Sequence, residues 1–156
     1  EILDTDTLGS LYFDRLYPMG VAALLQAVDL VRAGTAPRIV QDDSRATYEG
    51  WCRKEDVQID WRKPLQEIWN LIRGADPQPG AWTTYEGTTV QLLDARKLAG
   101  AGGGAPGEVT AIDETGLRVA ADGGQIQVTR VRAGGPKISA GDFAKTAGLR
   151  PGARLG

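Results

Sequence analysis

The chain has 156 residues, of which 42% are hydrophobic and 24% charged, and its formal net charge is −2. This composition is that of a soluble globular protein with one domain or two small ones, and it excludes a disordered chain, a collagen-like repeat and a disulfide scaffold. Because the sequence contains no histidine and a single cysteine, Cys52, it also excludes a Ser-His-Asp triad, a Cys-His pair, a His-ligated metal and a structural zinc site, and it favours a reducing cytoplasm as the compartment.

The start of the chain suggests a piece of a longer polypeptide, because it begins at Glu1 and its only methionine is Met19. The short charged start is not a signal peptide. No apolar run approaches the roughly 18 residues that a membrane span requires, so we expect no membrane contact.

The composition changes near Gly80. Residues 1–80 hold 6 of the 21 glycines and 7 of the 10 aromatic residues, with 9 Lys and Arg against 13 Asp and Glu, a balance of −4. Residues 81–156 hold 15 glycines and 3 aromatic residues, with 9 basic against 7 acidic residues, a balance of +2. We therefore predict a helical first part and a turn-rich second part. A balance of +2 is too weak to indicate nucleic acid, which is not an expected partner.

A bent helix or a helix pair is predicted over residues 7–17 and 18–33, within a helical unit that covers residues 1–34. The run from Asp4 to Thr7 offers N-cap side chains, Pro18 suits a first helical turn, and Gly34 supplies a left-handed stop. The spacing of the apolar residues favours one buried helix face, formed by Leu8, Leu11, Tyr12, Leu16, Val21, Leu24, Leu25, Val28 and Val31.

Residues 35–80 are predicted to form a connector that ends in a helix. The polar stretch after Pro37 has no helical period and suits an extended chain on the surface. Asp60 precedes the helix, Pro64 falls in its first turn, and Arg73-Gly74 end it. Its apolar face consists of Leu65, Ile68, Trp69, Leu71 and Ile72.

From Ala81 onwards the hydrophobic period falls to two, which indicates strands. Glu86-Gly87 and the run from Asp113 to Gly116 mark hairpin turns, and a change of parity predicts a bulge near Thr129-Arg130. Ser139 can cap a short turn, and residues 149–155 are expected to add a last strand. Five or six short strands favour a small closed barrel over residues 81–156, so the expected fold class is α+β.

Five segments occur in an order that is typical of one family: Thr5 to Gly20, Ala46 to Gly50, Ile59 to Trp61, Ile72 to Gly74 and Pro79 to Thr83. Over residues 1–98 they resemble the C-terminal half of the 10-formyltetrahydrofolate-dependent formyltransferases. That family includes methionyl-tRNA formyltransferase, the hydrolase domain of formyltetrahydrofolate dehydrogenase and sugar-nucleotide N-formyltransferases. Residues 99–156 match only in outline, through the spacing of the strands and the Asp142-Phe143 turn.

The resemblance implies a Rossmann-like catalytic domain upstream of Glu1 and an OB-like barrel over residues 81–156. In such enzymes an Asn, a His and an Asp carry the reaction, and we expect no catalytic residue in this chain. Asp4 and Asp6 are set aside as candidate acids because both stand in a helix-capping context. The cofactor 10-formyltetrahydrofolate is expected in the parent enzyme, with none bound by this chain alone, which is then inactive by itself.

Within the family, the segments Ile72 to Asp76 and Ala46 to Gly50 are more similar to the dehydrogenase's hydrolase domain than to methionyl-tRNA formyltransferase. The latter favours Phe-Asn-Pro-Trp-Pro where this chain has Ala75 to Pro79. The weakly charged barrel agrees with this, because a tRNA-gripping surface should be more basic. The acceptor stays open between a sugar amine, an acyl group, tRNA and water.

Tyr48 and Trp82 are the candidate residues of the substrate opening, because both stand in matched motifs where connector and barrel should approach the catalytic cleft. The alternative is that they are packing aromatics. Cys52 has no evident base beside it and is expected to be a free thiol without a catalytic task.

Two other functions are weighed against the formyltransferase. One is a stand-alone OB-like binding module for RNA or a carrier partner, and the other is a structural domain without a ligand. The apolar stripe of residues 1–33 should pack on the upstream domain. In its absence we expect a homodimer, or helices folded back against Trp69 and Leu65, with a barrel that folds independently.

Overall fold

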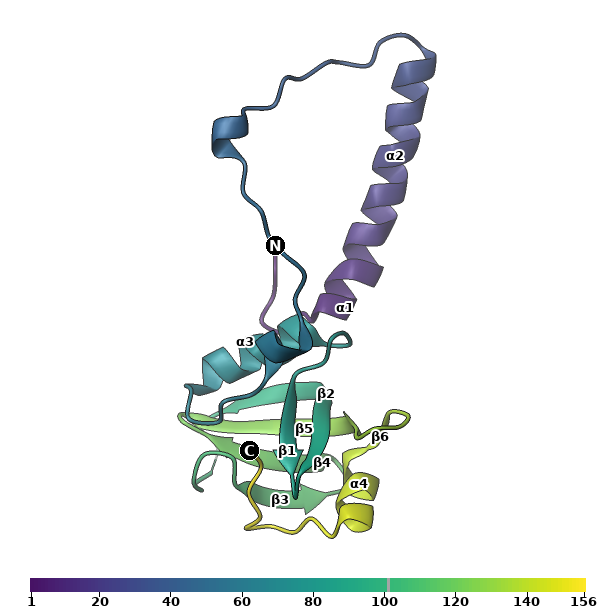
Figure 1. Ribbon diagram of the computed structural model, residues 1–156. Coiled ribbons are helices and arrows are strands. Elements are labelled where there is room, and N and C mark those ends of the chain that lie inside the picture. The colour runs from purple at the N-terminus through teal and green to yellow at the C-terminus, as the bar shows by residue number, and fades with distance from the viewer. Residues whose placement is uncertain (101) are drawn as a thin grey trace.

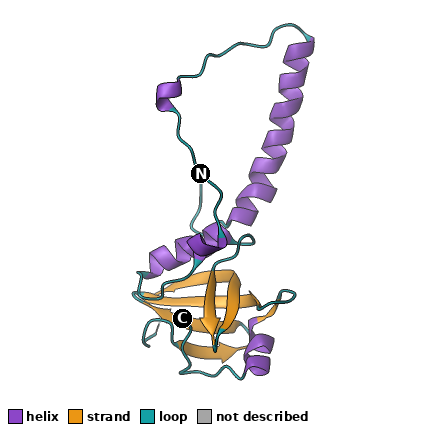
Figure 2. Ribbon diagram, viewed as in Figure 1, coloured by secondary structure: helices purple, strands orange, loops and turns teal. Residues whose placement is uncertain are grey.

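The computed structural model describes residues 1–100 and 102–156. A long helix and the extended connector that follows it project away from a small barrel, and a second helix lies on the barrel (Figure 1, Figure 2). The helices come first and the strands follow, so the predicted α+β class is confirmed.

The first helix is continuous and consists of α1 (Leu8–Ser10), a π-helical stretch (Leu11–Leu16) and α2 (Tyr17–Arg32). Thr7 caps its start, with the Thr7 Oγ1 accepting from Ser10 N at 3.1 Å. Pro18 has no N–H to donate four residues back, and the stretch before it uses the longer backbone bonds of a π-helix. No described helix is both long and apolar enough to cross a membrane.

The connector contains two 3₁₀ turns, Asp43–Arg45 and Lys54–Val57, and leads into α3 (Leu65–Ala75). Of the predicted apolar face, Leu65, Ile68, Trp69 and Ile72 are buried, whereas Leu71 is only partly buried. This face lies on the barrel and buries Leu65, Ile68, Trp69, Ile72 and Ala75.

The barrel is a six-stranded antiparallel sheet in the order β1-β2-β5-β4-β3, with β6 paired to β5. Its elements are β1 (Trp82–Tyr85), β2 (Thr88–Ala99), β3 (Val109–Asp113), β4 (Gly116–Ala121), β5 (Gly124–Arg132), β6 (Ile138–Ser139) and α4 (Ala140–Ala147). The Glu86-Gly87 turn joins β1 to β2 as predicted, and both of its residues have positive φ. The predicted cap at Ser139 is confirmed, because its side chain accepts from Asp142 N.

The C-terminal segment joins the two edge strands of the sheet. Leu155 N donates to Gly107 O at 2.9 Å, beside β3, and Gly156 N donates to Thr84 O in β1 at 3.0 Å. The expected strand over residues 149–155 is wrong as an element, because this segment contributes only an isolated bridge at Arg154. It nevertheless supplies the hydrogen bonds that link one edge of the sheet to the other.

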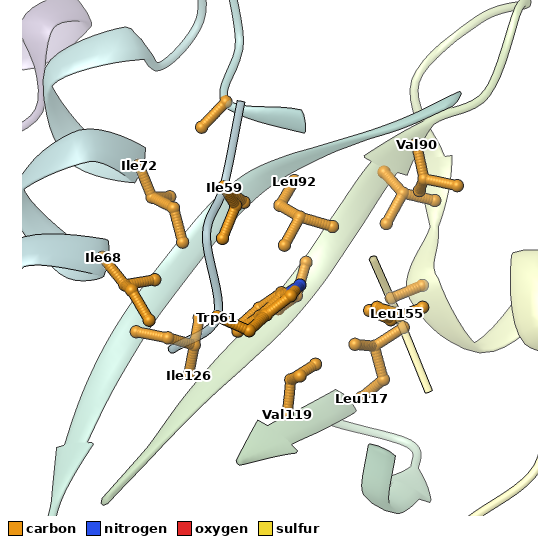
Figure 3. Close-up of a cluster of buried hydrophobic side chains, with 14 of the residues drawn as sticks. Ile59, Trp61, Ile68, Ile72, Val90, Leu92, Leu117, Val119, Ile126 and Leu155 are labelled. Carbon is orange, nitrogen blue, oxygen red and sulfur yellow. The ribbon is translucent and has the colours of Figure 1, made fainter. Parts of the chain in front are cut away.

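The core lies between α3 and the inner face of the sheet (Figure 3). Ile68 and Ile72 of α3 meet Leu92 and Ile126 of the sheet, and Trp61 lies among them. The Trp61 indole Nε1 donates to the buried Thr83 hydroxyl at 3.0 Å, which satisfies the one polar group that this side chain brings into the core.

The predicted bulge at Thr129-Arg130 is wrong. The pairing of β2 with β5 keeps one register on both sides of Asp94, which itself has a φ of 48°. The parity change in β5 therefore lies opposite a left-handed residue in β2. The register shift falls instead in β3, between Val109 and Ala111.

Candidate functional site

We call residues 17–56, which are α2 and the connector as far as Asp56, the arm. Every residue of the arm is exposed, and Leu24 is exposed to 67%. The large apolar residues among them are Tyr17, Met19, Val21, Leu24, Leu25, Val28, Leu30, Val31, Ile39, Val40, Tyr48 and Trp51. A helix that is apolar around most of its circumference is normally buried in a larger assembly, so the arm has the properties of a docking surface.

The expected fold-back of the N-terminal helices against Trp69 and Leu65 is wrong for α2, because no residue of α2 is buried. Only the chain ahead of α2 reaches the barrel side, where the Trp69 Nε1 donates to Asp4 O at 3.1 Å. The homodimer stays a prediction.

We call residues 3–15, where the arm attaches to the rest of the chain, the joint. Its first residues are held by α3 and β2. Arg73 donates to Leu3 O at 2.9 Å, and Lys97 pairs with the Asp4 carboxylate at 2.7 Å. The hydrogen bond from Lys97 holds the pKa of Asp4 below its usual range.

Asp6 lies at the centre of the joint and is only 6% exposed. Its carboxylate accepts from Leu3 N at 2.7 Å, from the Arg15 guanidinium at 2.7 Å and from the Ser10 hydroxyl at 3.4 Å. The Leu3 N–H, followed by the charge and hydrogen bond of Arg15, lowers the pKa of Asp6. A carboxylate that is held ionised by all these donors stabilises the local fold and is not suited to donate a proton.

Asp76 forms a second attachment between the joint and the barrel. Its backbone oxygen accepts from Gly9 N at 2.9 Å, and its buried carboxylate accepts from Asp94 N at 2.8 Å. Burial raises the pKa of Asp76. A Cβ at Gly9 would lie 2.9 Å from the Pro77 Cδ, so the close approach of these segments requires glycine.

The two candidate residues of the substrate opening lie on different elements. The Tyr48 side chain is on the arm and is 87% exposed, whereas Trp82 starts β1 and is half-buried. The Trp82 Nε1 donates to Lys54 O at 2.7 Å, and the Lys54 ammonium lies 5.3 Å from the centre of the Trp82 ring. Trp82 thus fixes the end of the arm to the barrel.

Trp51, 91% exposed, was missed as a candidate, although it lies only three residues after Tyr48.

A groove of the barrel with a volume of about 710 Å³ lies between β2, β5, the β3–β4 turn and α4. Its floor includes Gln127, which accepts from Arg96 at 2.7 Å and donates to the Thr115 hydroxyl at 2.6 Å. Its rim carries four carboxylates, Asp94, Asp113, Glu114 and Asp142, together with Arg96 and Lys145. Two of these carboxylates are ion-paired, Asp94 with Lys137 at 2.7 Å and Asp113 with Arg118 at 3.0 Å.

The lining of this groove has no net positive charge that would pair with the anionic glutamate tail of a folate. Among the described residues no three acidic or cysteine side chains stand close enough to hold a metal ion. The thiol of Cys52 is exposed on the arm.

Residues 52–148 match the family profile for the formyl transferase C-terminal domain. The methionyl-tRNA formyltransferase of Geotalea uraniireducens is 38% identical over 156 residues, which cover 99% of this chain and 49% of that protein. The corresponding protein of Bacillus velezensis is 36% identical over 158 residues, which cover 100% of this chain and 50% of that protein. The chain therefore spans about half the length of these curated relatives. They give no support to the expected similarity to the dehydrogenase's hydrolase domain.

Two solved structures have the same fold. A variant of HypX from Aquifex aeolicus superposes with a TM-score of 0.77 at 20% identity, covering 94% of this chain and 27% of that chain. HypX from Aquifex aeolicus in complex with tetrahydrofolic acid gives a TM-score of 0.70 at 21% identity, covering 81% and 23%. The fold is shared, and the family profile covers more than half of the sequence. The chain therefore belongs to the formyl transferase C-terminal domain family.

Proposed function

We propose that the chain is the C-terminal portion of a cytoplasmic enzyme that uses 10-formyltetrahydrofolate to transfer a formyl group to an acceptor or to water, and that it is inactive alone. The family membership supports this, as does the share of the curated relatives that the chain spans. The observation that carries the proposal is the arm, whose large apolar side chains are all exposed.

Formyl transfer needs a group that steers protons at the attacking amine or water and donors that stabilise the tetrahedral oxyanion. The sequence has no histidine, and its two most buried carboxylates are committed elsewhere, Asp6 to Arg15 and Asp76 to Asp94 N. The catalytic Asn, His and Asp, together with the folate site, then belong to an upstream Rossmann-like domain of the same polypeptide.

That upstream domain is the occupant we propose for the arm. Burial contributes about 25 cal/mol for each Å² of apolar surface, and a dozen large side chains offer such surface. The curated relatives are about twice as long as this chain, which provides for a domain of suitable size. A homodimer of this chain through α2 is the competing arrangement, and sedimentation of the full-length parent would distinguish a monomer from that dimer.

Thermal unfolding with a folate analogue tests whether the folate site lies in the upstream domain and not in this chain. We expect the analogue to raise the Tm of the full-length parent and to leave the Tm of this chain unchanged. The groove's lack of a net positive charge supports the second expectation. A clear shift for this chain alone would mean that the folate site is not upstream.

The names of the curated relatives make methionyl-tRNA a candidate acceptor for the whole protein. We propose that the barrel itself does not bind RNA, because its balance is only +2 and the lining of its groove has no net positive charge to attract phosphates. Filter binding of this chain to tRNA at low and physiological salt tests this. Retention that falls steeply with salt would favour the alternative of an RNA-binding module.

We propose that Tyr48 lines the substrate opening in the parent and that Trp82 has a packing role. Steady-state kinetics of the parent would separate these roles. We expect Tyr48→Ala to lower kcat/KM, with Tyr48→Phe as the matched control, and Trp82→Phe to lower the Tm through loss of the bond to Lys54 O. Unchanged kcat/KM in Tyr48→Ala would contradict the first assignment.

A further inference from the structure

Asp6 is the only buried residue among residues 1–56, all of which the structure describes. A buried carboxylate costs free energy unless charged or hydrogen-bonding partners surround it. Asp6 has such partners from both directions along the chain, with Leu3 N on one side and Ser10 and Arg15 on the other. Its burial is therefore specific to this geometry and does not follow from hydrophobic packing.

The two sides of Asp6 belong to different parts of the molecule. Ahead of it, Leu3 and Asp4 are held by α3 and β2 through Trp69, Arg73 and Lys97. Behind it, Ser10 and Arg15 belong to the helical run that continues as α2. The Asp6 carboxylate is thus the bridge between a segment fixed to the barrel and the start of the arm.

At the start of the helical run, the other attachment to the barrel side is the backbone bond from Gly9 N to Asp76 O, at 2.9 Å, beside the close approach of Gly9 to Pro77. The far end of the arm is tied separately, through the bond from Trp82 to Lys54 O. One point of attachment lets a rigid helix swing about it, whereas two points separated along the chain fix its direction. Arg15 strengthens the second point, because it donates both to Asp6 and to Glu1 O at 2.8 Å.

We propose that Asp6 is a positioning residue that fixes the direction in which the arm leaves the barrel. If the arm docks an upstream domain, a step that rests on the proposed function, Asp6 also sets the orientation of that domain over the barrel. The substitution of Asp6 would then loosen the arm while leaving the barrel folded.

The test measures the distance between two spin labels, one on Gln26→Cys in α2 and one on Glu114→Cys in the β3–β4 turn, in a Cys52→Ser background. This distance reports the direction of the arm relative to the barrel. Both sites are exposed, and the native thiol is removed. We expect one narrow distance distribution for the wild-type joint and loss of that narrow peak in Asp6→Ala. Asp6→Asn keeps an acceptor for Leu3 N but loses the charge that pairs with Arg15, so it should restore part of the peak.

The matched control is Asp14→Ala, which removes an exposed carboxylate from the same helical run and should keep the narrow peak. Arg15→Gln provides an independent variant and should broaden the peak with Asp6 still in place. The proposal is overturned if Asp6→Ala and Arg15→Gln keep the wild-type distribution, or if the wild-type distribution is already broad. Neither measurement involves folate or an upstream domain, so failure here is distinct from failure of the proposed function.

Discussion

The arm and the barrel use the same kinds of side chain with opposite results. Leu24 in the arm is 67% exposed, whereas Leu92 in β2 is completely buried. In the barrel, the buried apolar residues of the strands and of α3 form one core cluster, so the chain supplies its own partners. The apolar residues of the arm have no such core around them, which shows that an apolar pattern identifies a surface to be covered but not the element that covers it.

The largest expected difference between the barrel and the arm is in the stability that is lost when a leucine is truncated to alanine. Leu92→Ala should lower the free energy of unfolding by about 2–5 kcal/mol, because it removes transfer energy and leaves a cavity. Leu24→Ala should change it by less than about 0.5 kcal/mol in this chain. Urea denaturation of both variants checks the contrast, and similar losses would mean that the arm is packed in solution.

The buried pair of Trp61 and Thr83 allows a sharper test of how the barrel holds the connector. Trp61→Phe leaves the Thr83 hydroxyl unsatisfied and should cost about 1–3 kcal/mol. Thr83→Val leaves the indole N–H unsatisfied in the same way. The double variant should cost less than the sum of the two single variants, and strict additivity in a double-mutant cycle would show that the bond contributes nothing.

The elements that sequence alone predicts are those with local signals. The spacing of Leu65, Ile68 and Ile72 predicted α3, the Glu86-Gly87 pair predicted the first hairpin, and Gly34, with a φ of 71°, ends the first helix as expected. In each case the determining residues lie within one or two turns of one another.

The features that sequence did not predict depend on distant partners. The two-residue strand β6 has no period of its own and exists because it pairs with β5. The parity change between Val128 and Val131 lies where β5 faces Asp94 of β2, which has a positive φ, so its cause lies on another strand. In the candidate site, Asp6 had the sequence context of a helix cap, and only the position of Arg15 beside it accounts for its burial.

Asp76 gives an effect that depends on pH. Burial raises its pKa, so the folded chain binds this proton more tightly than the unfolded chain, and the resulting stability is lost as pH rises through the raised value. Asp76→Asn keeps an acceptor for Asp94 N without a charge, so its stability relative to wild type should increase from acidic to neutral pH.

Asp113→Asn provides the control of opposite sign for that experiment. The Thr115 hydroxyl lowers the pKa of Asp113, so wild type should lose stability relative to this variant as pH falls. Thermal unfolding of the three proteins across that range is the measurement. If the Tm of wild type and the Tm of Asp76→Asn change with pH in parallel, Asp76 has an ordinary pKa in the folded chain.

The smallest effect is expected at Asp60, where the connector meets the barrel. Its carboxylate accepts from the Arg62 side chain at 2.8 and 2.9 Å, and these bonds lower its pKa from 3.8 to about 2. A lowered pKa contributes stability that is present above the ordinary value and is lost as pH falls towards about 2. Because the Arg62 side chain is 86% exposed, water and salt screen the pair, and Asp60→Asn should leave the Tm at neutral pH nearly unchanged. An NMR titration of the Asp60 carboxyl carbon checks the pair itself. A midpoint at the ordinary value would mean that Arg62 does not hold Asp60 in solution, and this edge of the barrel would then resemble the arm more than the core.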